Sequence, residues 1–93
     1  MSNRVFLNDN TIIEIEVIGD QNAASVELMG RQVDTLITQL KSGGKPCLVL
    51  DNLQQMGRVD PEARRLVVEL GKRLQFDRCA MVGQGALMRF GTN

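Results

Sequence analysis

Few side chains in this sequence could take part in acid–base or metal chemistry. The 93-residue chain contains no histidine, so it has neither a histidine general base nor a histidine metal ligand. Its two cysteines, Cys47 and Cys79, lie within apolar runs, whereas a reactive thiolate needs an electropositive and partly exposed setting. We therefore expect both thiols to pack as small apolar groups, and no set of nucleophile, base and orienting residue can be assembled. The sequence predicts a protein that is not an enzyme and that uses no cofactor and no metal.

Two acids, Asp51 and Asp60, flank a predicted loop at residues 52–59 and could meet at a cation. Two carboxylates make a poor cage for a hard ion, however, so the favoured interpretation is that Asp51 ends a strand and Asp60 caps a helix. Arg58 lies in the same predicted loop, beside Gly57, at the strand end where open α/β sheets bind ligands. It is either a binding residue or an ordinary solvated loop arginine.

The stretch at residues 46–74 is the centre of the predicted fold. An unbroken apolar run predicts a strand at residues 47–50 that is buried on both faces. Asp60 is a strong N-cap candidate, Pro61 suits the first helical position, and Glu62 complements the positive end of the helix dipole. A strand followed by a helix is therefore expected here, with the helix continuing to Leu74.

The patterns in the rest of the chain predict a hairpin followed by alternating helices and strands. The expected elements are strands at residues 4–7 and 11–18, a helix at 22–42, a strand at 78–82 and a short helix at 86–90. The order β-β-α-β-α-β-α predicts an α/β fold with a mostly parallel sheet and helices packed on it. In this reading the strand at 78–82 is an unprotected edge, which predicts self-association of the chain through that strand.

The composition narrows the classes of partner. Ninety-three residues make one domain. Eleven basic and eleven acidic residues cancel, which argues against nonspecific binding to nucleic acid or to an anionic membrane surface. The chain has three Phe and no Trp or Tyr, so it offers few side chains on which bases could stack. No apolar run approaches the roughly 20 residues of a membrane span, and no signal peptide is visible. The two cysteines show no C-x-x-C spacing. We therefore expect the protein in a reduced, cytoplasmic setting.

Several short motifs in their order along the chain are similar to those of a known family. They are Leu48-Val-Leu-Asp51, then Gly57-Arg58-Val-Asp60-Pro-Glu-Ala-Arg-Arg65, then Phe76-Asp77-Arg78 and Met81-Val82-Gly83. This combination resembles the SpoIIAA-like branch of the STAS (sulfate transporter and anti-sigma-factor antagonist) domains, also described as STAS/SEC14-like. The resemblance implies a sheet with helices stacked on one side and a regulatory or ligand-sensing role. It also implies that residues 1–93 form a single STAS-like domain that lacks the family's last strand and helix, as a truncated domain or a domain of a larger protein.

The resemblance carries an expectation about the start of the second long helix. In the antagonist members this helix starts with Asp-Ser-Ser-Gly, and an anti-sigma factor of the kinase type phosphorylates the second serine. The present chain keeps the aspartate as Asp60 but has Pro61 and Glu62 in place of the serines. No hydroxyl is available there, and Glu62 supplies a permanent negative charge.

These observations lead to two hypotheses. The first is a non-enzymatic regulatory module of bacterial type that binds a protein partner. Its expected partner-binding residues are Arg58, Asp60, Glu62, Arg64 and Arg65. The alternative is a small-ligand or lipid carrier or sensor, with an apolar cavity between helices and sheet. Its expected methionine lining is Met29, Met56, Met81 and Met88.

Overall fold

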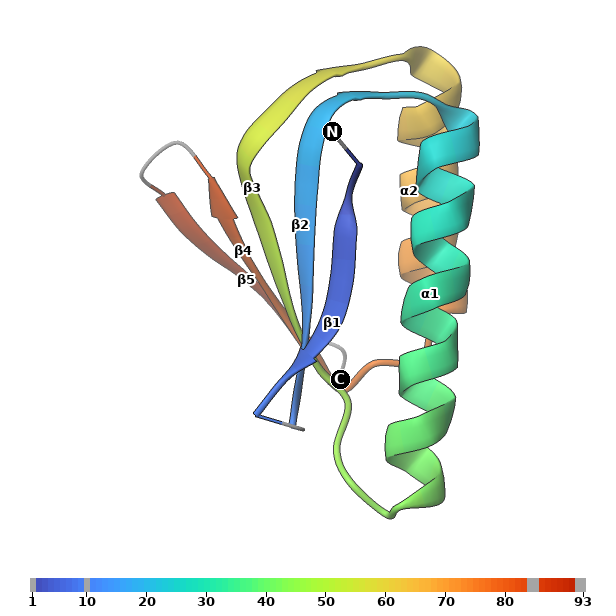
Figure 1. Cartoon of the computed structure of the whole chain (residues 1–93), viewed down its shortest axis with the longest axis vertical. Coiled ribbons are helices and arrows are strands. Elements are labelled where there is room, and N and C mark those ends of the chain that lie inside the picture. Colours follow the sequence, from blue (N-terminus) through green and yellow to red (C-terminus); the bar gives the residue numbers. More distant parts are fainter. Residues whose placement is uncertain (1, 10, 84–85, 92–93) are drawn as a thin grey trace.

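In the described part of the chain, one sheet carries two long helices on the same face (Figure 1). The computed structural model describes residues 2–9, 11–83 and 86–91, and for residues 86–91 it describes the backbone. The elements in chain order are β1 (Arg4–Asn8), β2 (Ile12–Gln21), α1 (Ala23–Ser42), β3 (Leu48–Val59), α2 (Pro61–Arg73), β4 (Arg78–Gly83) and β5 (Ala86–Gly91).

The five strands lie in the sheet in the order β1-β2-β3-β4-β5. The three inner strands, β2, β3 and β4, run parallel to one another. The outer strands β1 and β5 pair antiparallel with their neighbours. The predicted α/β fold, with its hairpin, its parallel inner strands and its helices packed on the sheet, is confirmed.

Both long helices begin at side-chain caps that the sequence provides. Asn22 caps α1, where its Oδ1 accepts the Ser25 backbone N–H at 2.9 Å and the Ser25 hydroxyl oxygen accepts the Asn22 N–H in return at 3.1 Å. Asp60 caps α2 and Pro61 occupies its first turn, as predicted. Within the described residues, no helix is both long enough and apolar enough to cross a membrane.

The main core lies between the sheet and α1, and α2 packs against α1 beside it. The buried residues of the core are Ile13, Ile15, Val17, Val33, Ile37, Leu40, Cys47, Val49 and Cys79. A second buried cluster, formed by Val26, Ala63 and Leu70, joins the two helices. Gly30 lets the helices approach closely, because a Cβ atom at this position would lie 2.8 Å from a methyl carbon of Leu70.

The short helix predicted at residues 86–90 is wrong. The segment forms β5, which pairs antiparallel with β4 from Gly83↔Ala86 to Arg78↔Gly91. A five-residue helix gains few internal hydrogen bonds, whereas a strand here pairs with the backbone groups on the open side of β4. Because β4 is paired on both sides, it is not the unprotected edge that was expected. Self-association of the chain stays a prediction, but it is no longer supported by an unpaired strand at residues 78–82.

The predicted loop at residues 52–59 is also wrong, because this segment is the second half of β3. Likewise β2 continues to Gln21 and does not end at Ile18. The two extensions pair with each other through Ile18↔Gln55, Gly19↔Met56 and Gln21↔Val59, with two shifts of register. Polar, glycine-containing segments can form strands when each provides the other's hydrogen bonds, so the local turn propensity was overridden.

Candidate functional site

The carboxyl ends of β2 and β3 and the starts of both helices lie at one end of the molecule (Figure 1). A depression of about 370 Å³ opens there, lined by Asp20, Gln21, Asn22, Arg58, Val59 and Asp60. The Asp60 backbone N–H donates to the Gln21 carbonyl oxygen at 3.2 Å, which ties the end of β2 to the start of α2. The structure therefore brings two of the predicted partner-binding residues, Arg58 and Asp60, to one depression.

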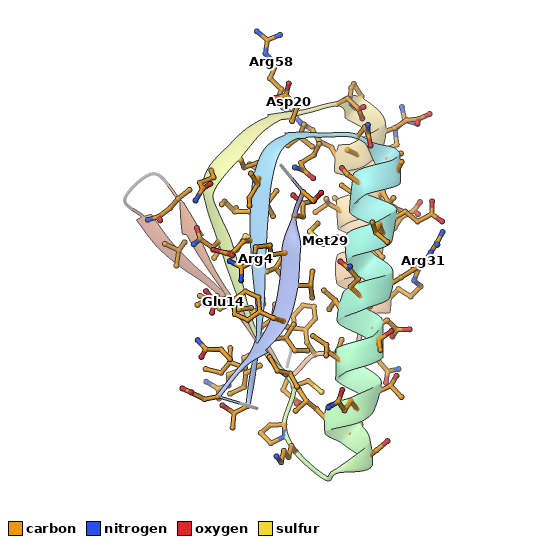
Figure 2. The ribbon with its side chains drawn as sticks, in the orientation of Figure 1. Arg4, Glu14, Asp20, Met29, Arg31 and Arg58 are labelled. Atoms are coloured by element: carbon orange, nitrogen blue, oxygen red, sulfur yellow. The ribbon has the colours of Figure 1, made fainter. Side chains whose placement is uncertain are left out.

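The backbone around Arg58 is held by the end of β2. The Arg58 N–H donates to Oδ1 of Asp20 at 2.8 Å. Gly57 permits this approach, since a Cβ atom at residue 57 would collide with the Asp20 carboxylate and lie 3.1 Å from the Asp20 backbone nitrogen. Figure 2 shows the Arg58 side chain extending away from the body of the protein. Arg58 is thus an exposed cation on a fixed backbone.

The buried side-chain amide of Gln21 holds the same end of the sheet through hydrogen bonds. Gln21 is only 5% exposed, although it is polar. Its Nε2 donates to Oδ1 of Asn3 at 3.1 Å and to the carbonyl oxygens of Ile18 and Gly19, each at 3.0 Å. A satisfied buried network of this kind fixes the local geometry.

The remaining predicted residues lie on the first two turns of α2. The Asp60 carboxylate accepts the Ala63 N–H at 2.8 Å, so part of its hydrogen-bonding capacity is used by the helix. Glu62, Arg64 and Arg65 are all exposed. Glu62 and Arg65 are three residues apart and face the same side of the helix, while Arg64 lines a separate cavity described below.

The ion pairs within the described residues are Arg4–Glu16 and Glu27–Arg31. None of the charged side chains at the start of α2 takes part in either pair. The cations of Arg58, Arg64 and Arg65 are therefore available to an external group.

A second candidate site lies between α2 and the sheet, where two cavities adjoin. The inner cavity has a volume of about 120 Å³ and the outer cavity of about 490 Å³. Both are lined by Val26, Met29, Asp51, Val67 and Met81. Figure 2 shows Met29 pointing from α1 toward the sheet. Three apolar side chains of the outer cavity are exposed: Met56 by 37%, Val67 by 43% and Val68 by 57%.

The side chain of Asp51 provides the carboxyl group that lines both cavities. Side chains alternate along a strand, so Asp51 shares the helix-covered face of β3 with Val49, two residues before it, and Leu53, two residues after it. Its Oδ1 exposes less than 1 Å² and has no hydrogen-bond partner among the described residues. This burial raises the pKa of Asp51 from 3.8 to about 6.

The interpretation of Asp51 as a strand-end acid is therefore wrong. Asp51 lies inside β3, paired with Ile15 on one side and Met81 on the other. Asp51 and Asp60 are nine residues apart along an extended strand that rises about 3.3 Å per residue. The distance between them along the strand is therefore more than about 20 Å, and the two acids do not share a cation. Among the described residues, no group of three His, Cys, Asp or Glu side chains is placed to hold a metal ion.

Both cysteines are free and buried, as predicted for small apolar groups. Burial, with a further contribution from Asp51, raises the pKa of the Cys79 thiol to about 11. Burial, followed by the charge of Asp77, also raises the pKa of Cys47. Both thiols are therefore protonated near neutral pH and make poor nucleophiles.

Solved structures share the fold of this chain. The anti-sigma factor antagonist SpoIIAA in its unphosphorylated form superimposes with a TM-score of 0.59 at 18% sequence identity, over 78% of this chain and 63% of that chain. An uncharacterised DUF3478-family protein with a SpoIIAA-like fold, from Shewanella loihica PV-4, gives a TM-score of 0.68 at 17% identity, over 91% and 68% of the two chains. A chain described as Mglu gives 0.55 at 22% identity, over 89% of this chain and 19% of that chain. No protein-family model matches the sequence, and the search of curated proteins gives no match.

The fold class follows from these similarities. The chain is a domain with the SpoIIAA-like STAS fold, which confirms the resemblance seen in the sequence. It spans less than two thirds of the SpoIIAA chain.

Proposed function

We propose that this STAS-type domain is a non-enzymatic regulatory module that binds a protein partner through the start of α2. The proposed binding surface, which we call the α2-start face, consists of Arg58, Asp60, Glu62, Arg64 and Arg65. One observation supports it above others: exposed charges of both signs are gathered on a fixed strand end and helix cap, and none of them belongs to an ion pair in the described part of the chain. Mixed charges of this kind give a protein interface specificity and fast association.

The chemistry of this face differs from that of a phosphorylation switch. Pro61 and Glu62 occupy the positions where the resemblance implies serines, so no hydroxyl stands at the helix start to accept a phosphoryl group. The Glu62 carboxylate lies in the first turn of α2, where the helix dipole favours negative charge. In this proposal the face carries its negative charge permanently, and its partner recognises the chain without phosphorylation at this position.

The test is a pull-down from a lysate of the source organism with a charge-reversed chain. The variant Arg58→Glu/Arg65→Glu reverses two cations of the face. A matched control, Lys72→Glu/Arg73→Glu, reverses two exposed cations in the last turn of the same helix. We expect the same partner to be recovered by the wild type and by the control, and about tenfold less of it by the first variant. Equal recovery by all three proteins, each checked for native helix content by circular dichroism, would remove the α2-start face from the proposal.

The second candidate function is the binding of a small ligand, and the cavities between α2 and the sheet favour it. The outer cavity, at about 490 Å³, has the size of small-molecule sites and is mostly apolar with few polar groups. Met29, Met56 and Met81 line it, as expected from the sequence, and the side chain of Met88 lies outside the described residues. Native mass spectrometry of freshly purified protein tests this function, since a bound small molecule would add its mass to the chain. The α2-start face and the lining of the outer cavity share only Arg64, so one function can fail while the other stands.

A further inference from the structure

We infer that the inner and outer cavities bind a small amphiphilic molecule that carries one protonated amine, and that Asp51 is the residue that pairs with the amine. This inference deepens the second candidate function and rests on it. The described structure assigns the carboxyl group of Asp51 no other role, since it belongs neither to an ion pair nor to a helix cap.

The position of Asp51 supports a ligand that donates hydrogen bonds. An ionised carboxylate only accepts hydrogen bonds, and Oδ1 of Asp51 receives none from the described residues. Its neighbours in the inner cavity are hydrocarbon or sulfur groups such as Val49, Leu70 and Met81. A carboxylate in such surroundings is costly unless a cation or a donor pairs with it, so a ligand that brings a protonated amine gains a strong interaction that an alcohol provides only in part.

The other charges around the cavities favour one positive group placed beside Asp51. Of the elements that line them, β4 contributes one titratable group, the Cys79 thiol, and α2 contributes one cation, Arg64. The lining residues from β2 and α1 carry no titratable group. Cys79 is neutral because its pKa is raised to about 11. Arg64 repels a second cation from the outer cavity, where the apolar body of the ligand would lie.

The depth of the carboxyl group favours a small molecule over a flat protein surface. Oδ1 of Asp51 exposes less than 1 Å², so a group must enter the cavity to reach this oxygen. The torsion about the Cβ–Cγ bond of an aspartate is broad, and a small rotation presents either oxygen to a ligand. The apolar side chains at the mouth, Met56, Val67 and Val68, would cover the body of such a molecule.

The experiment is a titration of the isotope-labelled full chain, followed by NMR chemical shifts, with three probes of equal length. The probes are n-hexylamine, hexan-1-ol and hexanoate at pH 7.5. We expect shifts at residues lining the cavities, with the amine binding about tenfold more tightly than the alcohol and hexanoate weakest. Asp51→Asn should abolish the preference for the amine, and Asp34→Asn, which removes an exposed acid of α1 outside the cavities, should retain it.

Two further experiments test the inference without replacing Asp51. One lowers the pH of the wild type, and the other narrows the cavity by a substitution at Gly71. In the wild type, the advantage of the amine should fall at pH 5, because Asp51 becomes protonated below its pKa of about 6 while the alkylamine stays charged. Gly71→Leu should weaken binding of the amine and the alcohol alike. Gly71 lines the inner cavity, and a Cβ at this helical position meets no heavy atom within 4 Å, so this variant is expected to fold.

Each remaining outcome decides against a stated part of the inference. Equal binding of amine and alcohol to the wild type, or an amine preference that Asp51→Asn keeps, would overturn the role of Asp51 but leave a ligand site. An absence of shifts with every probe would overturn both the inference and the second candidate function. A dimer in solution whose interface covers Val67 and Val68 would show that a second copy of the chain occupies the outer cavity, which also overturns the inference.

Discussion

Replacing Asp51 with asparagine should change how the stability of the protein depends on pH. The folded protein binds a proton at Asp51 more tightly than the unfolded chain does, since burial raises the pKa from 3.8 to about 6. Proton binding at Asp51 therefore adds to the free energy of unfolding. This contribution is fully present below pH 3.8 and is lost as the pH rises through about 6. Above pH 6 the folded state holds a half-buried carboxylate whose Oδ1 is buried and has no partner among the described residues, and asparagine removes that charge at nearly constant size.

The magnitude follows from the two pKa values. A difference of about two pH units corresponds to about 3 kcal/mol over the whole titration, of which about 2 kcal/mol is lost between pH 4.5 and pH 7.5. A domain of this size changes its melting temperature by about 4–8 °C for each kcal/mol. Relative to the wild type, Asp51→Asn should therefore gain about 2 kcal/mol of stability between pH 4.5 and 7.5. The unsatisfied amide of the asparagine adds a cost that is the same at both pH values.

Urea denaturation followed by circular dichroism at 222 nm measures this difference. The chain has no Trp or Tyr, so the signal of its two helices is the better probe. The other carboxyl groups titrate equally in both proteins and cancel from the comparison. Asp34→Asn, which removes an exposed acid, should follow the pH dependence of the wild type. If Asp51→Asn also followed it, the carboxyl group would be hydrated or paired, and both the stability argument and the amine inference would lose their basis.

Two further predictions concern the helices. Gly71→Ala should stabilise the protein by about 1 kcal/mol, because Gly71 lies inside α2 and the added methyl group meets no heavy atom within 4 Å. The matched change Gly30→Ala has the same gain in helix propensity, but its Cβ would lie 2.8–2.9 Å from the Leu70 methyl carbons, so the protein should be about 1–3 kcal/mol less stable than Gly71→Ala. Urea midpoints compare the two, and equal shifts would contradict the packing described for Gly30. Asp60→Ala should cost about 1 kcal/mol, because the N–H of Ala63 loses its acceptor. Asp60→Asn, which can still cap the helix, should recover most of the loss, and a deficit that asparagine does not recover would mean that capping is not the source of the effect.

The elements that the sequence predicts well are those where local pattern and tertiary structure agree. The helix at Pro61–Arg73 begins at Asp60 and Pro61 because each residue suits its position locally, whatever packs against the helix. The buried strand that starts at Leu48 was visible in its apolar run for the same reason. The α/β fold class follows from the order of these elements, and the SpoIIAA-like resemblance rests on that order together with the short motifs between Leu48 and Gly83.

The elements that it misses depend on pairing between distant segments. The polar residues Gln54 and Gln55, followed by Gly57, have the composition of a loop, yet they extend β3 because β2 also extends beside them. Likewise the segment Ala86–Gly91 becomes a strand by pairing with β4. Neither pairing can be deduced from local propensity, since the partner strand decides it.

The error at residues 52–59 also hid the cavity site. A strand that ends at Leu50 makes Asp51 a strand-end acid, while the longer strand places it on the helix-covered face between Val49 and Leu53. The alternation of Val49, Asp51 and Leu53 was the available signal, because it puts one acid among apolar residues of a single strand face.

The second half of β3 links the two candidate sites physically. Its inward side chains Leu53 and Met56 line the outer cavity, and the same strand ends at Arg58, whose backbone is fixed by Asp20. Val67 and Arg64, which also line the outer cavity, belong to the helix that starts at Asp60. A ligand that fills the outer cavity would therefore contact both elements that carry the α2-start face. If both proposals hold, hexylamine at a concentration that just saturates the wild type should change partner recovery by the wild type and change recovery by Asp51→Asn much less, because the variant binds the amine about tenfold more weakly and a ligand shifts partner affinity only where it binds.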